Sequence, residues 1–153
     1  KNNLEGKKVV VVFGRESHPL TRTFFIPKLA MIYRNLTENR DDVEFLFVSR
    51  DGTETAFNRF TKPMPWPVIP WDQDKTRAQL GDILYAPLKK ETGYGAECGV
   101  VILDSDHETI INPDAEPCIQ KTHDDSGKDF PFQVSAAENC CAAATCLVLC
   151  TIM

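Results

Sequence analysis

The sequence predicts one α/β domain in which helices cover both faces of a mixed β-sheet. Two segments are almost entirely apolar: Val9–Phe13 has no charged residue, and Val43–Ser49 has only Glu44. Such runs are typical of strands buried on both faces of a sheet. Between them lies a segment with helical spacing of its apolar residues, and this order is typical of a parallel βαβ unit.

The first helix is expected from Pro19 to about Leu36. Its apolar residues follow one another at spacings of one, three and four, which places them on one helix face: Phe24, Phe25, Leu29, Ile32, Tyr33 and Leu36. Pro27 removes a backbone donor inside this pattern, so we expect the helix to bend there. Two further helices are expected at Thr53–Phe60 and Arg77–Leu88.

The remaining segments predict a loop, a hairpin and a tail. Lys62–Pro67 holds three prolines and is expected to be a structured loop. Gly99–Asp104 followed by His107–Ile111 predicts an antiparallel hairpin, which would make the sheet mixed. The composition changes after Phe132, so we divide the chain into a domain of residues 1–132 and a Cys/Ala-rich tail of residues 133–153.

Charge and motifs narrow the function classes. The chain has 17 Lys and Arg against 22 Asp and Glu, a net charge of −5, so no nucleic-acid partner is expected. No apolar run reaches the ~18 residues of a spanning helix and no signal-peptide pattern is seen, so we expect a cytoplasmic protein. Phosphate-loop, dinucleotide, serine-hydrolase and zinc-protease motifs are missing, and we expect no cofactor. Cys118 and His123 lack further ligands at ordered spacing, so no metal site is expected.

Several short motifs follow one another between residues 4 and 132. They are Leu4–Phe13, Met64-Pro65-Trp66, Ile69–Gln73, Gln79-Leu80-Gly81 and Asp129–Phe132. Together they resemble the tryparedoxins, which are thioredoxin-fold dithiol oxidoreductases of trypanosomatid parasites, and more loosely the nucleoredoxins. The resemblance implies a thioredoxin-like fold, a central mixed sheet flanked by helices, and a role in thiol redox metabolism.

The resemblance also implies a W-C-P-P-C active site after the first long strand, where this chain has Ser17-His18-Pro19-Leu20-Thr21. His18 stands at the position of the attacking cysteine and Thr21 at that of the resolving cysteine. Neither side chain can form a disulfide, so the ordinary dithiol mechanism is excluded. Pro27 falls one residue later than the family's helix proline, which implies a local insertion between Thr23 and Pro27.

A second family landmark is a cis-proline that faces the cysteine pair, and the aligned residues here are Ala96-Glu97-Cys98-Gly99. A cis peptide without proline costs about 3 kcal/mol, so we expect another backbone in this loop, with Cys98 near the degenerate site. Cys98 is then the candidate catalytic thiol, through glutathionylation or monothiol exchange. The alternative is an unreactive loop residue, since Glu97 opposes a thiolate.

Three other side chains leave alternatives open. His18 is a ligand, an acid–base group, a partner contact or a helix-cap neighbour without a function of its own. Trp66 and Trp71 bracket the proline-rich loop, and they either pack beneath the active-site face or form a partner-binding surface.

Four of the six cysteines lie in the tail, at positions 140, 141, 146 and 150. One interpretation is an Ala-rich packed helix over about residues 136–149. A second is a lipid anchor, because Cys150-Thr151-Ile152-Met153 has the form of a prenylation box and Cys140, Cys141 or Cys146 is available for a second lipid. The protein would then be membrane-associated through its tail. A third is redox chemistry of the tail thiols themselves.

Two functions are carried forward, and the sequence leaves open whether the chain is an enzyme. The first is a redox-inactive binding or regulatory protein that contacts a protein partner or a small thiol around His18, Trp66 and Cys98. The second is a protein-disulfide oxidoreductase with atypical monothiol chemistry through Cys98 or the tail cysteines. Loss of both active-site cysteines favours the first.

Overall fold

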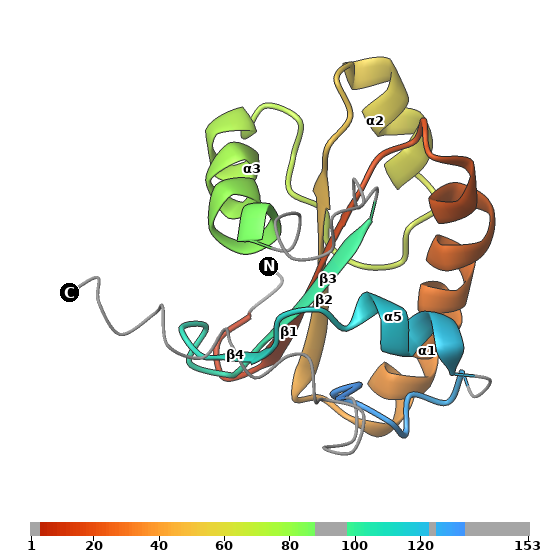
Figure 1. Ribbon diagram of the computed structural model, residues 1–153, viewed down its shortest axis with the longest axis vertical. Helices are drawn as coiled ribbons and strands as arrows, with labels where there is room; N and C mark the ends of the chain where they lie inside the picture. The colour runs from red at the N-terminus through yellow and green to blue at the C-terminus, as the bar shows by residue number, and fades with distance from the viewer. Residues whose placement is uncertain (1–3, 88–97, 123–124, 134–153) are drawn as a thin grey trace.

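The computed structural model describes residues 4–87, 98–122 and 125–133. Within these ranges a four-stranded mixed sheet has helices on both faces (Figure 1). The strand order is β2-β1-β3-β4, and the strands span Lys8–Gly14 (β1), Val43–Ser49 (β2), Gly99–Leu103 (β3) and Ile110–Asn112 (β4). β1 pairs in parallel with β2 and antiparallel with β3, and β4 pairs antiparallel with β3. The predicted mixed sheet is confirmed.

β1 lies in the middle of the hydrophobic core. Its residues from Val9 to Phe13 are at most 3% exposed. Because successive side chains of a strand point to opposite faces, Val10 and Val12 belong to one core cluster and Val9, Val11 and Phe13 to the other. A strand that contributes to both clusters needs apolar residues at every position, as the sequence has here.

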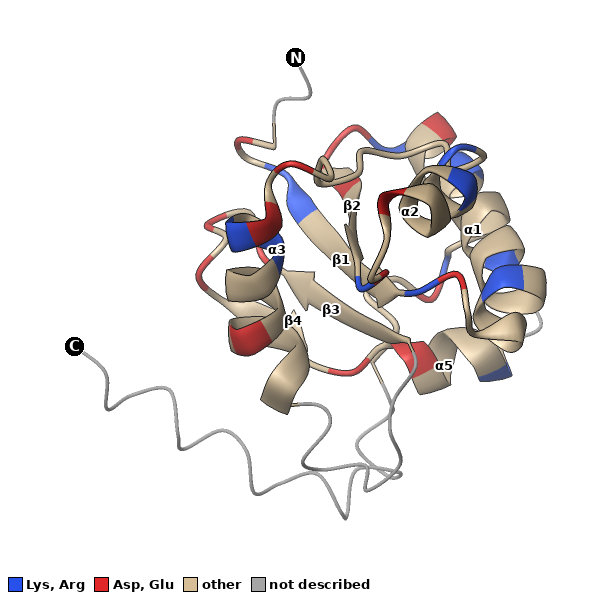
Figure 2. Cartoon of the chain, turned by 90° about the horizontal axis from the view of Figure 1, so that it is seen from above, with Lys and Arg blue, Asp and Glu red and all other residues tan. Residues whose placement is uncertain are grey.

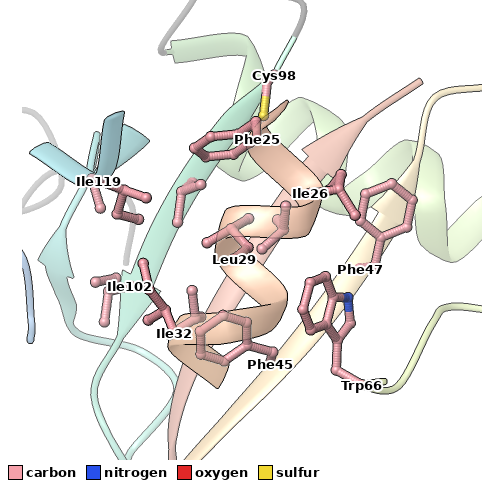
Figure 3. Close-up of a cluster of buried hydrophobic side chains, with 14 of the residues drawn as sticks. Phe25, Ile26, Leu29, Ile32, Phe45, Phe47, Trp66, Cys98, Ile102 and Ile119 are labelled. Carbon is pink, nitrogen blue, oxygen red and sulfur yellow. The ribbon is translucent and has the colours of Figure 1, made fainter. Parts of the chain in front are cut away.

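The two faces of the sheet are covered by different helices. α1 (Ile26–Asn39) and α5 (Glu116–Lys121) lie on one face, together with Phe60 of α2 (Glu54–Thr61). Figure 3 shows Leu29 and Ile32 of α1 packing over the strands, with Trp66 beside Phe45. On the other face, the π-helical turn η2 (Gly81–Tyr85) contributes Leu84 and Tyr85, and Leu80 of α3 (Asp74–Leu80) packs against them.

The first predicted helix divides into two parts. A π-helical turn, η1 (Thr21–Phe25), precedes α1, and Pro27 lies in the first turn of α1. Ile26 N–H still donates to the Thr21 carbonyl oxygen across the π turn, and Pro27, which has no N–H, follows directly where the helix changes to the regular pattern. A π turn absorbs one extra residue, so the irregularity expected around Thr23–Pro27 is this turn.

Two other elements differ from their predicted bounds. α3 begins at Asp74, three residues before the predicted Arg77, and the predicted end at Leu88 lies outside the described residues. β4 begins at Ile110, later than the predicted His107. The Asp106 carboxylate accepts the N–H groups of Glu108 and Thr109, and these bonds hold the start of the predicted strand in a turn.

In the described ranges, no helix is long and apolar enough to cross a membrane. The loop of residues 88–97 and the tail from residue 134 onward lie outside those ranges. The three interpretations of the tail, including lipidation of Cys146 and Cys150, therefore stay predictions, and so does the domain boundary after residue 132.

Gly127 provides a test of the packing of α1. It has a φ of +76°, and a Cβ built on it would lie 2.6 Å from Cγ of Leu36. We expect Gly127→Ala to lower the free energy of unfolding by about 2–4 kcal/mol, because it adds a clash to a left-handed backbone. Urea denaturation measures the difference. Gly52→Ala is the control, since a Cβ there meets nothing within 4 Å, and an equal loss in both variants would contradict the packing.

Candidate functional site

The segment after β1 is tied to the end of β2. Arg50 N–H donates to the Gly14 carbonyl oxygen at 2.9 Å, and Glu16 N–H donates to Asp51 Oδ1 at 2.8 Å. β1 and β2 are parallel, so their carboxyl ends meet at one edge of the sheet, where the sites of open α/β sheets are usually built. Residues 17–21 therefore start from a fixed position.

His18 caps the start of the helix with its own ring. Nδ1 lies 3.2 Å from the Thr21 backbone nitrogen and 2.7 Å from Thr21 Oγ1. A backbone N–H only donates, so Nδ1 is the acceptor and the ring proton is assigned to Nε2. The Thr21 hydroxyl then donates to the same ring nitrogen. Of the alternatives for His18, the helix-cap role is the one these contacts support, and the ring itself is the cap.

Thr21 connects the helix start to the beginning of β3. It is 2% exposed, and its Cγ2 would lie 3.3 Å from a Cβ at Gly14, so the glycine leaves room for it. Gly99 pairs with Phe13 in the sheet, and this register carries Cys98 to the helix start. The Cys98 thiol is hydrogen-bonded to the Thr21 side chain. The predicted proximity of Cys98 to residues 17–21 is confirmed.

The surroundings of Cys98 oppose a thiolate. The residue is 9% exposed and its sulfur lies close to Phe25 (Figure 3). Burial raises the pKa of the Cys98 thiol well above its ordinary value, and the carboxylates of Glu116 and Asp114 raise it further. The backbone N–H of Gly99 and the contact with the Thr21 side chain lower it in part. Reactive cysteines have electropositive surroundings, so this environment is that of a structural thiol.

An ion-pair cluster beside residues 17–21 was not predicted from the sequence. Glu16 Oε1 accepts from Arg22 Nη1 at 3.0 Å, and Glu16 Oε2 lies 2.9 Å from Arg59 Nη2. Hydrogen bonding to Arg59 is the main cause of a lowered pKa at Glu16, and Arg22 adds to it. Glu16 and Arg59 are 43 positions apart, so no local pattern in the sequence joins them.

The two tryptophans have different roles. Trp66 is 4% exposed, and its ring centroid lies 5.5 Å from that of Phe45 and 5.6 Å from that of Tyr33. The partner-binding alternative for Trp66 is therefore wrong, because its ring is enclosed in the core. Trp71 is half-buried, with the Arg77 guanidinium 4.3 Å from its ring centroid. A partner contact by Trp71 stays a prediction.

The other predicted residues are spread over the domain. Ser17 and Pro19 are exposed at the helix start, while Cys118 is half-buried in α5. In the described part of the chain, no group of three or more His, Cys, Asp or Glu residues is arranged to hold a metal ion.

Both the sequence and the fold of this chain are similar to those of known proteins. A sequence model of a family described as Thioredoxin-like matches residues 6–109. Probable nucleoredoxin 2 of Oryza sativa subsp. japonica is 28% identical over 131 residues, which are 86% of this chain and 30% of that protein. Tryparedoxin from Trypanosoma brucei has a TM-score of 0.68 at 27% identity and covers 86% of this chain and 83% of its own. Tryparedoxin II in complex with glutathionylspermidine has a TM-score of 0.70 at 25% identity, again covering 86% and 83%.

The chain spans about three tenths of the length of the rice nucleoredoxin but most of the length of the tryparedoxins. The predicted thioredoxin-like fold and the predicted resemblance are both confirmed by these matches. The family model covers more than half of the chain, from Gly6, two residues before β1, to Thr109, the residue before β4. The chain therefore belongs to the Thioredoxin-like family and is related to the tryparedoxins and nucleoredoxins.

Proposed function

We propose that this chain is a redox-inactive binding or regulatory protein of thiol redox metabolism. The observation that carries the proposal is the composition of the site: His18 and Thr21 hydrogen-bond to each other where the tryparedoxin pattern has its two cysteines. The nearest thiol, Cys98, is buried beside carboxylates. A disulfide cannot form between an imidazole and a hydroxyl, so the site retains the family's geometry without its electron transfer.

A protein partner is supported by the surface next to this site. Leu20, Phe24 and Met31 are 62%, 68% and 52% exposed. All three belong to the stretch of residues 20–31 that forms the start of the η1–α1 helix. Apolar side chains grouped on a surface in this way are typical of interaction sites. We place the partner surface here rather than at Trp66.

The second candidate function is monothiol exchange. It is favoured by the hydrogen-bonded row from the Cys98 thiol through Thr21 to His18, because a base within such a row could accept the thiol proton. The substrate of that chemistry would be the disulfide form of a small thiol: the Cys98 sulfur would attack one sulfur of the disulfide, and the other would leave as the free thiol. A small thiol is supported by the tryparedoxin II that is complexed with glutathionylspermidine. The tail cysteines Cys146 and Cys150 are the other candidate thiols. A cytoplasmic location, with membrane association only if Cys150 is lipidated, completes the proposal.

The first test is reduction of a disulfide substrate. We expect the purified chain to show no turnover above a thiol blank, and the same result for Cys98→Ser and for a shortened chain that ends at Phe132. Turnover that disappears in Cys98→Ser would instead establish monothiol exchange at Cys98. Turnover that disappears only in the shortened chain would assign the chemistry to the tail.

The second test reinstalls the cysteine pair. His18 and Thr21 are in side-chain contact across one helical turn, a spacing within the reach of a disulfide. We expect the His18→Cys/Thr21→Cys variant to lose two free thiols on oxidation, counted with a thiol reagent, and to gain disulfide reductase activity. The Ser17→Cys/Thr21→Cys variant is the control, because position 17 is exposed and outside the cap. Equal behaviour of the two variants would contradict the geometry.

The third test measures the reactivity of Cys98. A raised pKa means a small thiolate fraction, so we expect iodoacetamide at pH 8 to label Cys98 at least about tenfold more slowly than Cys118. The rate should still be rising above pH 9. Peptide mass spectrometry separates the two cysteines.

Glu116→Gln should speed the labelling of Cys98 a few-fold, because it removes a carboxylate that raises the pKa of the thiol. Glu38→Gln, on the exposed end of α1, is the matched control and should change nothing. Equal labelling rates of Cys98 and Cys118 in the unsubstituted chain would contradict the buried, acidic environment of Cys98.

A further inference from the structure

A groove lies between α1, α2 and the proline-rich loop that follows α2. Figures 1 and 2 both show α2 and α1 as neighbours on the same side of the sheet. The groove has a volume of about 280 Å³. Its base includes Ile26 and Phe60, which are 6% and 3% exposed, and its rim includes the exposed rings of Pro27, Pro63 and Pro65.

The same groove carries an uneven set of charges. Arg22, Arg59 and Glu16 line it, so two cations share one anion. The side chains of Arg22 and Arg59 are 55% and 67% exposed, whereas that of Glu16 is 11% exposed. The accessible charge is therefore positive, on a chain whose net charge is −5.

Both guanidinium groups retain donors for a second acid. Glu16 uses Nη1 of Arg22 and Nη2 of Arg59, and a guanidinium has five N–H groups in a planar fork that fits a carboxylate. A volume of about 280 Å³ is at the small end of ligand sites, enough for one or two side chains. Proline rings offer apolar contact and no N–H donor, so the neighbouring positions favour apolar groups.

We propose that this groove binds an extended segment of a partner protein in which an acidic side chain is flanked by bulky apolar side chains. The acidic group pairs with Arg22 and Arg59, and an apolar neighbour packs on Ile26 and Phe60 between the proline rings. The inference goes beyond the proposed function. The groove contains none of His18, Thr21 and Cys98, so it does not depend on whether the chain has redox activity.

The test uses two capped peptides, Leu-Glu-Phe-Glu-Leu and its Gln counterpart Leu-Gln-Phe-Gln-Leu, with the full ¹⁵N-labelled chain. We expect the acidic peptide to shift the amide signals of Ala30, Arg59 and Phe60 and the side-chain Nε signals of the two groove arginines. The Gln peptide should bind about tenfold more weakly or worse, because it lacks the charge that the guanidinium groups recognise. Added salt should weaken the acidic peptide selectively.

Arg59→Gln should reduce the affinity for the acidic peptide about tenfold without altering the fold, because the side chain is exposed. Arg34→Gln is the matched control, since Arg34 is an exposed arginine of α1 that does not line the groove. No binding, shifts confined to other residues, equal binding of both peptides, or an equal loss in Arg34→Gln would each overturn the proposal. Disulfide turnover is measured separately, so either proposal can fail alone.

Discussion

The position of every functional side chain depends on the burial of β1 along both edges and on both faces. β2 and β3 occupy its two edges, and two separate core clusters cover its faces. The hydrogen bonds to both neighbouring strands hold its position, since Val9–Val12 have no alternation of polar and apolar side chains that would fix the register. The end of β1 at Gly14 sets the position from which residues 15–21 continue. The pairing of Phe13 with Gly99 sets the position of Cys98, the residue before β3.

The burial that places Cys98 also raises the pKa of its thiol. Cys98, the residue before β3, is buried in the same core cluster as Phe25, and its thiol contacts Thr21 at the helix start. Glu116 of α5 is close enough to raise the pKa of this thiol. Desolvation and the nearby carboxylates both disfavour the anion. The same geometry with a lysine in place of Glu116 would favour the thiolate, so this one carboxylate of α5 bears directly on the chemistry open to Cys98.

The strands β1 and β2 were predictable, because the short apolar runs Val9–Phe13 and Val43–Ser49 are typical of buried strands. The π turn was not, since spacings of one, three and four fit a regular helix as well as one with an extra residue. The late start of β4 depends on the turn around Asp106, which competes with strand pairing. At the site, motif alignment and strand register placed His18, Thr21 and Cys98 together. The pairing of Glu16 with Arg59 needed the tertiary structure, because it joins a loop to a helix 43 residues away.

The π turn Thr21–Phe25 separates two parts of one helix, and each part makes its own set of contacts with the rest of the domain. Below it, Leu29, Ile32 and Leu36 must keep their phase against the sheet, because each is at most 3% exposed. Above it, His18 must keep its phase against Thr21. A residue gained within the turn rotates one part relative to the other by about 100°. The turn thus acts as a spacer: its extra residue lets Thr21 stay against Gly14 and Cys98 while Leu29, Ile32 and Leu36 keep their contacts with the sheet.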